Sequence, residues 1–160
     1  MALRFDKKGS AMKKFYKLGF ISLILIVLML VNPFKLVMVV GPSMYPTLKN
    51  GNILLAKKTD HYNRGDIVVA KLEDGIVFIK RVVGLPGDHI YFYYDKEKIF
   101  LNDNYSEINQ FIKLHNNIKL YDTILNNNEY FLVGDNKNNS YDSREFGAVK
   151  KEEILYKVIK

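Results

Sequence analysis

The sequence predicts an all-β domain preceded by one apolar helix. The chain has 160 residues, 48% of them hydrophobic, which is enough for one packed core. Beyond position 34 its apolar residues occur in short β-rich runs separated by turn residues. Before these runs lies a single apolar stretch without charged side chains, residues 18–31. We therefore expect one β domain behind a helical anchor.

The N-terminal part predicts attachment to a membrane. The basic side chains of residues 1–17 are Arg4, Lys7, Lys8, Lys13, Lys14 and Lys17, against Asp6 alone. The fourteen residues 18–31 fall short of the about 20 that cross a bilayer, but apolar residues on both sides extend the stretch. Residues 18–34 are thus predicted to be a single-pass transmembrane anchor in the cell membrane. The basic tail keeps the N-terminus cytoplasmic and places residues 35–160 outside.

A cleaved signal peptide is the alternative to an anchor, because it has the same order of basic and apolar regions. Asn32-Pro33-Phe34-Lys35 offers no small-x-small cleavage site, which favours the uncleaved anchor. Gly9-Ser10-Ala11 reads like a linker, so we consider residues 1–11 an extension before a native start at Met12.

Composition excludes several classes of function. The chain has no Cys, which excludes disulfide frameworks, thiolate catalysis and Cys-based metal sites. The formal net charge of +7 lies mostly in the tail, and the remainder is nearly balanced. This is not the basic surface of a nucleic-acid-binding protein. We expect no nucleic-acid partner, no metal and no cofactor.

The strands are expected at 36–40, 53–56, 67–70, 76–83, 90–94, 130–133 and 154–159. Asp74-Gly75 predicts a tight hairpin turn, and Pro86-Gly87 suits the central positions of a type II turn. Residues 102–128 are rich in Asn with few clear strands, so we interpret them as an insert.

Ser43 and Lys80 are the candidate reactive side chains. Period 2 in the run 76–83 places Lys80 on the same face as Phe78 and Val82, where an ammonium is poorly solvated. Burial can lower a lysine pKa by about 3 units or more, and a neutral amine can take the proton of a serine hydroxyl. The alternative is an edge-strand lysine whose amine reaches water.

Three stretches carry a resemblance to a known family: Ser43-Met44-Tyr45-Pro46-Thr47-Leu48, then 80–88, and lastly Gly134-Asp135-Asn136 with Ser140-Tyr141-Asp142-Ser143-Arg144. In these motifs, in their order and in the preceding anchor, the chain resembles the bacterial type I signal peptidases. The resemblance implies a coiled β-sheet or barrel domain. It also implies a serine endopeptidase that cleaves signal peptides from exported preproteins at small-x-small sites. It covers nearly the whole chain apart from 102–128.

By this resemblance Ser43 is the nucleophile and Lys80 the general base. The supporting residues it implies are Ser140, which orients the lysine, and Asp142, Ser143 and Arg144, which brace the site. The family often has a serine at the position of Gly41, so the oxyanion hole is expected to use the backbone of Gly41 and Ser43. Lys137 replaces a usual arginine, for which we expect a modest effect.

The resemblance also indicates where the substrate lies. The residues expected to contact small side chains before the cut are Met44, Leu48, Ile79, Val37 and Val39. Plain core packing is the alternative for each. The region 34–40 is a candidate for contact with membrane lipid. His61, His89 and His115 match no catalytic position.

Two other functions are weighed against a general signal peptidase. Self-cleaving repressors share the Ser/Lys pair but need a DNA-binding domain where this chain has the anchor. A membrane-anchored pilus-assembly factor would use the same fold without proteolysis, and the presence of both Ser43 and Lys80 argues against it. Among proteolytic functions, a dedicated pilin is the alternative to general secreted proteins as client.

Overall fold

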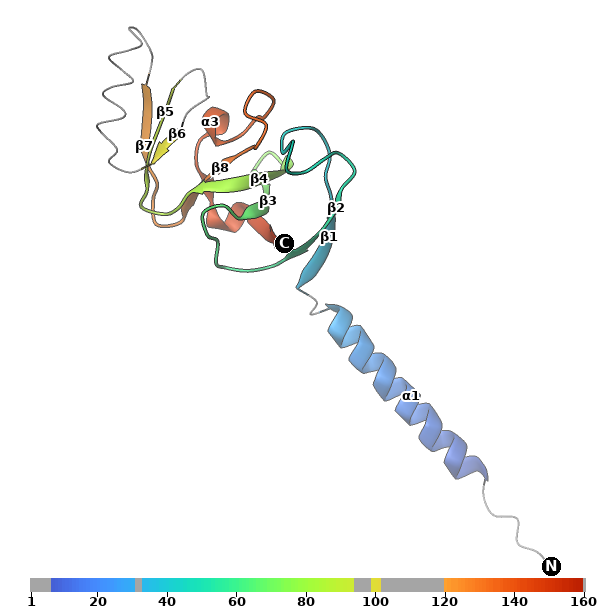
Figure 1. Ribbon diagram of the computed structural model, residues 1–160. Coiled ribbons are helices and arrows are strands. Elements are labelled where there is room, and N and C mark those ends of the chain that lie inside the picture. The colour runs from blue at the N-terminus through green and yellow to red at the C-terminus, as the bar shows by residue number, and fades with distance from the viewer. Residues whose placement is uncertain (1–6, 31–32, 94–98, 102–119, 160) are drawn as a thin grey trace, which may run out of the picture. The chain divides into compact units, whose positions relative to one another are not determined.

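The computed structural model describes residues 7–30, 33–93, 99–101 and 120–159, and the chain divides into two units, Met1–Pro33 and Phe34–Lys160. The first unit contains helix α1 (Lys7–Leu30), drawn in Figure 1. Its side chains Phe15, Leu18 and Phe20 are exposed. No helix in the described ranges is both long enough and apolar enough to cross a membrane. The transmembrane anchor over 18–34 stays a prediction.

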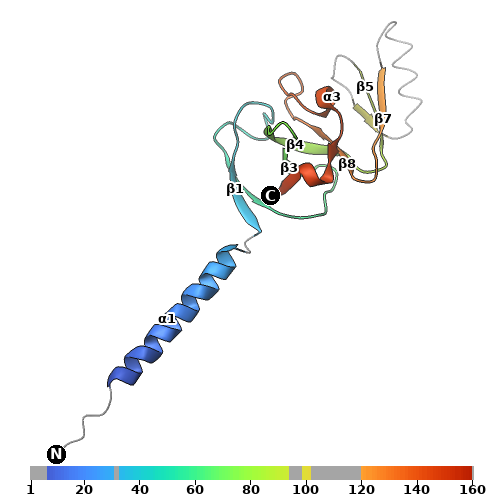
Figure 2. The same cartoon turned by 180° about the vertical axis from the view of Figure 1, so that it is seen from behind.

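The second unit, called the β unit below, is built on a seven-stranded antiparallel sheet (Figures 1 and 2). Its strands are β1 (Phe34–Met38), β2 (Ile53–Lys57), β3 (Ile67–Lys71), β4 (Val77–Gly84), β8 (Glu129–Val133), β9 (Val149–Lys150) and β10 (Ile154–Val158). The strand order is β1-β2-β10-β3-β4-β8-β9, with β1 and β9 at the edges. The all-β prediction is confirmed, and the two-residue strand β9 is an addition to it.

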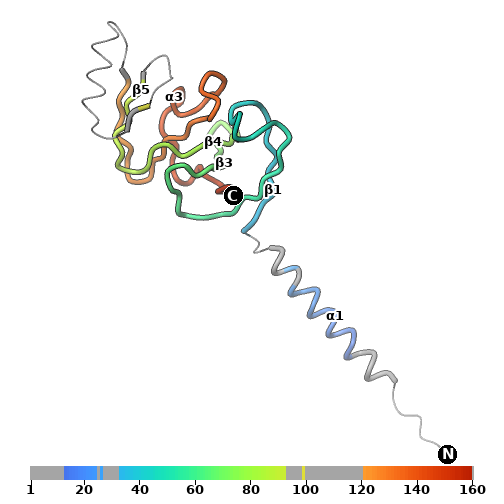
Figure 3. Tube along the Cα trace, in the orientation of Figure 1, coloured from blue at the N-terminus to red at the C-terminus, as the bar shows by residue number. Residues whose placement is uncertain are grey.

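A second sheet has the order β6-β5-β7; its strands are labelled in Figure 1, and β5 is also labelled on the tube of Figure 3. It consists of β5 (His89–Tyr93), β6 (Ile99–Leu101) and β7 (Leu120–Ile124). Strand β7, which the sequence did not predict, lies at the C-terminal end of the expected insert 102–128: Tyr121 pairs with Phe92 of β5, and their rings stack 5.2 Å apart. The Asn-rich sequence around β7 hides its alternation. Residues 102–119 of the expected insert lie outside the described residues.

Strands β3 and β4 separate two buried clusters of side chains, which explains their nearly continuous apolar sequences. Val68 of β3 and Val82 of β4 pack in one cluster together with the partly buried Phe78. Ile67, Val69 and Ile79 pack in the other. Since side chains alternate along a strand, Lys80 shares the face of Phe78 and Val82, as the sequence predicts.

Turn chemistry fixes the loops at both ends of β4. Gly75 has φ of +90° in the β3–β4 hairpin, as Asp74-Gly75 predicts. In the turn after β4, Gly87 has φ of +84° and the Asp88 N–H donates to the Leu85 carbonyl at 3.0 Å. This is the predicted type II geometry. The short helices α3 (Ser143–Phe146) and η1 (Lys151–Glu153) complete the β unit.

Candidate active site

Ser43 lies in a compact turn between β1 and β2. The Tyr45 N–H donates to the Pro42 carbonyl at 3.0 Å, and Met44 is 1% exposed, so the turn is anchored in the core. Asn136 fixes the turn from outside: its backbone N–H donates to the Ser43 carbonyl at 2.9 Å, and its side-chain amide donates to the Pro42 carbonyl at 3.1 Å. The Ser43 backbone is therefore tied to the loop that follows β8.

Lys80 of β4 meets Ser43 at a distance of 2.9 Å between Nζ and Oγ. Although lysine is seldom buried, Lys80 is only 3% exposed. Burial lowers the pKa of the Lys80 amine; the Asp142 carboxylate opposes this shift and the Arg144 guanidinium adds to it. The Phe78 ring, with its centroid 5.6 Å from Nζ, contributes to the apolar surroundings. The predicted pair is thus brought together from residues 37 positions apart.

Asp142 is the hub of the hydrogen bonds behind this pair. Its carboxylate is fully buried and accepts hydrogen bonds from the Gly134 N–H at 2.9 Å and from the Ser140 hydroxyl at 2.6 Å. Arg144 donates to it through Nε and Nη2, each at 2.8 Å. Burial acts to raise the pKa of Asp142, but the hydrogen bonds from Arg144, Gly134 and Ser140 together lower it. Asp142 is therefore a carboxylate held by a bidentate arginine.

The four expected supporting residues gather around one end of β8. Ser143 accepts the Leu132 N–H at 2.9 Å through Oγ, and Arg144 also reaches the Lys137 carbonyl at 3.2 Å. Ser140 donates to Asp142, whereas Lys80 Nζ, among the described residues, is hydrogen-bonded to Ser43. The direct orienting contact between Ser140 and Lys80 therefore stays a proposal.

Gly134, Arg81 and Asp135, for which the sequence predicted no individual role, also make contacts around this site. A Cβ on Gly134 would stand 2.6 Å from the Ser43 carbonyl oxygen and would also collide with the Ser140 side chain. Arg81, the neighbour of Lys80 on β4, makes a bidentate ion pair with Asp135 at 2.7 and 2.6 Å. The Gly-Asp-Asn motif was the signal: each of its residues fixes a different part of the site.

A cleft of about 290 Å³ opens beside Ser43 and Lys80. Of the residues expected to contact substrate, Val39, Met44 and Ile79 line it. Leu48 and Val37 belong to the same apolar cluster but are not part of the cleft wall, so the structure brings three of the five together there.

Gly41 also borders the cleft, with φ of +89° and open space where a Cβ would stand. Its N–H donates to the Asn50 side chain at 3.0 Å and is engaged within the protein. Gly41 therefore offers room beside Ser43, while its expected part in the oxyanion hole stays a proposal.

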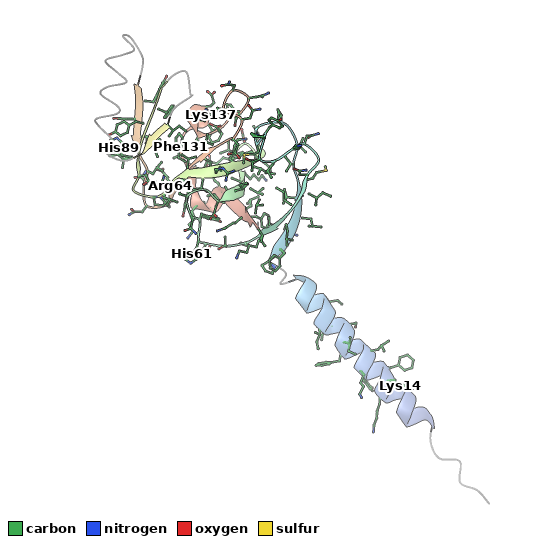
Figure 4. All side chains as sticks on the ribbon, viewed as in Figure 1. Lys14, His61, Arg64, His89, Phe131 and Lys137 are labelled. Atoms are coloured by element: carbon green, nitrogen blue, oxygen red, sulfur yellow. The ribbon has the colours of Figure 1, made fainter. Side chains whose placement is uncertain are left out.

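His61 and His89, the two histidines in the described residues, do not line this cleft. His61 is exposed on the loop after β2, and His89 belongs to β5 of the small sheet (Figure 4). His115 lies outside the described residues. In the described part of the chain, no three His, Cys, Asp or Glu side chains gather into a set able to hold a metal ion.

A hydroxyl within hydrogen-bond reach of a buried amine, beside an open cleft, is the arrangement of a serine hydrolase with a lysine base. Residues 12–159 match the family described as "Signal peptidase, peptidase S26". The chain belongs to this family and is a serine endopeptidase of the signal peptidase I type.

Relatives of known name agree with this assignment. The chain is 34% identical to signal peptidase I P of Bacillus subtilis subsp. natto, over 94% of this chain and 90% of the relative. It is 33% identical to signal peptidase I V of Bacillus subtilis strain 168, over 72% of this chain and 77% of the relative. A crystal structure of a signal peptidase I from Enterococcus faecalis V583 matches with a TM-score of 0.44 and 26% identity, covering 62% of this chain and 97% of that one.

Gly134→Ala tests the packing behind Ser43. The added methyl group must displace the Ser43 carbonyl or the Ser140 side chain, and displacements near 1 Å at a reacting group cost about 100-fold in rate. We expect kcat/KM on a signal-peptide substrate to fall by about that factor while the thermal unfolding transition stays cooperative. Unchanged kcat/KM would show that the site tolerates a methyl group there and would contradict the packing argument.

Proposed function

We propose that the protein cleaves signal peptides from exported preproteins with Ser43 as nucleophile and Lys80 as general base. The observation that carries this proposal is the 2.9 Å contact between the buried Lys80 amine and the Ser43 hydroxyl at an open cleft. The lowered pKa of Lys80, caused by burial, favours the neutral amine that a base requires.

The reaction follows from these two side chains. Lys80 Nζ takes the hydroxyl proton as Ser43 Oγ attacks the carbonyl carbon before the cut. The resulting ammonium gives this proton to the leaving amine, which departs as the N-terminus of the mature protein. Lys80, neutral again, then activates a water molecule that hydrolyses the ester on Ser43 and releases the signal peptide.

We propose that the backbone of the Ser43 turn stabilises the negative charge that develops on the oxygen of the tetrahedral intermediate. The Ser43 N–H is the proposed donor, since backbone N–H groups at the nucleophile stabilise such an oxyanion. Gly41 allows the peptide backbone to approach, because no atom lies within 4 Å of the place where a Cβ would stand. The Gly41 N–H can donate to the oxyanion only if its hydrogen bond to the Asn50 side chain breaks when substrate binds.

The substrate is proposed to lie extended along β4. Strand β8 pairs with β4 from Arg81 onward, and in the described residues the stretch 77–80 is paired on its β3 side only. This open edge can accept a peptide strand, as exposed strand edges do in other peptide-binding proteins. Val39 and Ile79 narrow the cleft with apolar side chains, which suits small residues before the cut.

Substitutions of the pair test the mechanism. Ser43→Ala and Lys80→Met should each lower kcat/KM on a signal-peptide substrate by about 1000-fold or more, because the two residues act as a unit. Lys80→Arg should be equally inactive, since a guanidinium is not deprotonated at working pH.

Lys71→Arg, an exposed lysine of β3, is the matched control and should keep wild-type activity. Appreciable turnover by Lys80→Arg would refute Lys80 as the base. A folded wild type that cleaves no precursor would favour the assembly-factor alternative, and a panel of precursor proteins distinguishes general secreted clients from one dedicated pilin.

We further propose that α1 attaches the protein to the cell membrane and that the β unit contacts lipid. The outward faces of β1 and β2 support the lipid contact: Leu36 pairs with Leu55 and Met38 with Ile53, and Leu36 and Ile53 are 75% and 70% exposed. The basic tail supports a cytoplasmic N-terminus. Membrane attachment would place the cleft where exported chains leave the bilayer.

Protease treatment of intact cells tests this orientation. Protease added outside should digest the β unit and spare residues 1–17, because the tail is predicted to be cytoplasmic. Alkaline carbonate should leave the protein in the membrane fraction. Protection of the β unit in intact cells would contradict the orientation, and release by carbonate would contradict the anchor.

A further inference from the structure

Tyr141 is an exposed aromatic residue on the wall of the catalytic cleft. It is 62% exposed, although it stands between Ser140 and the fully buried Asp142. It lines the same cleft as Ser43 and Lys80. By contrast, Tyr62 and Tyr130 are each 7% exposed and pack in the core, while Tyr45 of the Ser43 turn is 54% exposed but is not part of the cleft wall. The exposure of Tyr141 therefore needs an explanation other than core packing.

Three rings lead from the Lys80 amine to Tyr141. The Phe78 centroid lies 5.6 Å from Lys80 Nζ, and the rings of Phe78 and Phe146 are 5.4 Å apart. Phe146 is in turn 5.4 Å from Tyr141. These three rings, Phe78, Phe146 and Tyr141, form an aromatic row whose two end members, Phe78 and Tyr141, line the cleft. Phe78 also shares one face of β4 with Lys80.

Sheet topology limits the path of a bound peptide. A peptide laid against the open edge of β4 at 77–80 occupies the position that β8 takes from Arg81 onward. It cannot continue straight past Lys80, because β8 and the loop that follows it fill that position. Beyond the cut, the chain must turn out over this loop, whose residues on the cleft wall are Asn139 and Tyr141.

Proton transfer to the leaving group also places the start of the departing chain near the loop that carries Asn139 and Tyr141. The amine that protonates the leaving group must lie within hydrogen-bond reach of the leaving nitrogen. Lys80 Nζ is this amine under the proposed function, so the leaving nitrogen lies at the Lys80 end of the open edge 77–80, in the cleft whose wall also includes Asn139 and Tyr141. The first residues of the departing chain then pass the exposed ring of Tyr141.

From this geometry we infer that Tyr141 is a specificity-determining residue for the start of the mature chain. Its ring contacts the side chain of the first or second residue after the cut and favours apolar or aromatic side chains there. This inference rests on the proposed function. Under this inference the cleft selects residues after the cut, through Tyr141, separately from its preference for small residues before the cut.

Cleavage of matched peptides by the full chain in detergent micelles tests the inference. The peptides share one signal sequence ending in Ala-x-Ala and carry Gly, Ala, Leu or Phe at the first or second position after the cut. Wild type should prefer Leu and Phe by about 3- to 10-fold in kcat/KM, the range of an aromatic contact. Tyr141→Ala should lose this preference, so that its kcat/KM values for the Leu and Phe peptides fall to that for its Gly peptide, and Tyr141→Phe should retain the preference.

Ile124→Ala is the matched control, because Ile124 is 66% exposed on the small sheet and should leave all rates unchanged. Equal preference in wild type and Tyr141→Ala would overturn the inference. So would a Tyr141→Ala effect confined to residues before the cut, which would place the ring on the acyl side. A wild type that cleaves none of the peptides would refute the proposed function and this inference with it, whereas cleavage without a Tyr141 effect would refute the inference alone.

Discussion

The rest of the site depends on the removal of the Lys80 amine from water. Keeping a free lysine neutral at pH 7 costs about 5 kcal/mol, and burying an unpaired ammonium costs several kcal/mol, so small changes in the surroundings decide which form is present. Strand β4 places the lysine on an apolar face with Phe78 and Val82, where it is 3% exposed. The Ser43 turn then brings a hydroxyl to within 2.9 Å of this amine.

A buried carboxylate close to Lys80 would stabilise the charged ammonium, and a charged ammonium cannot act as a base. Asp142 does act in that direction on the pKa of Lys80. Arg144 counteracts it, because its bidentate contacts at 2.8 Å occupy the Asp142 carboxylate. Asp142 also accepts hydrogen bonds from the Ser140 hydroxyl and the Gly134 N–H, which hold these two residues in position. The supporting residues thus hold the loop in place without fixing a proton on the lysine.

Alternating apolar residues and turn glycines were sufficient for strands β1 to β5, β8 and β10, but not for the short strands β6 and β9. The Ser43–Lys80 pair was expected from the family resemblance, since the apolar run around Lys80 alone was also compatible with an edge-strand lysine. Strand β7 was missed, since Asn-rich sequence flanks its five residues and its pairing with β5 is set by residues distant along the chain. The roles of Gly134 and Asn136 depend on loop packing against the Ser43 turn, which no local pattern encodes. The resemblance implied that Ser140 orients Lys80; its hydroxyl donates to Asp142 in the structure, and a direct contact with Lys80 stays a proposal.

A direct titration of the Lys80 amine is the most decisive measurement. The full chain, labelled with ¹⁵N in its lysine side chains, is titrated by NMR in detergent micelles, and Lys80→Met identifies the Lys80 signal by its loss. Because burial lowers the folded-state pKa, the neutral amine should persist as pH falls below the value of a free lysine, about 10.4, and should be protonated only at lower pH. A Lys80 signal that titrates at about 10.4 would contradict the account, since the amine would then be a cation at working pH.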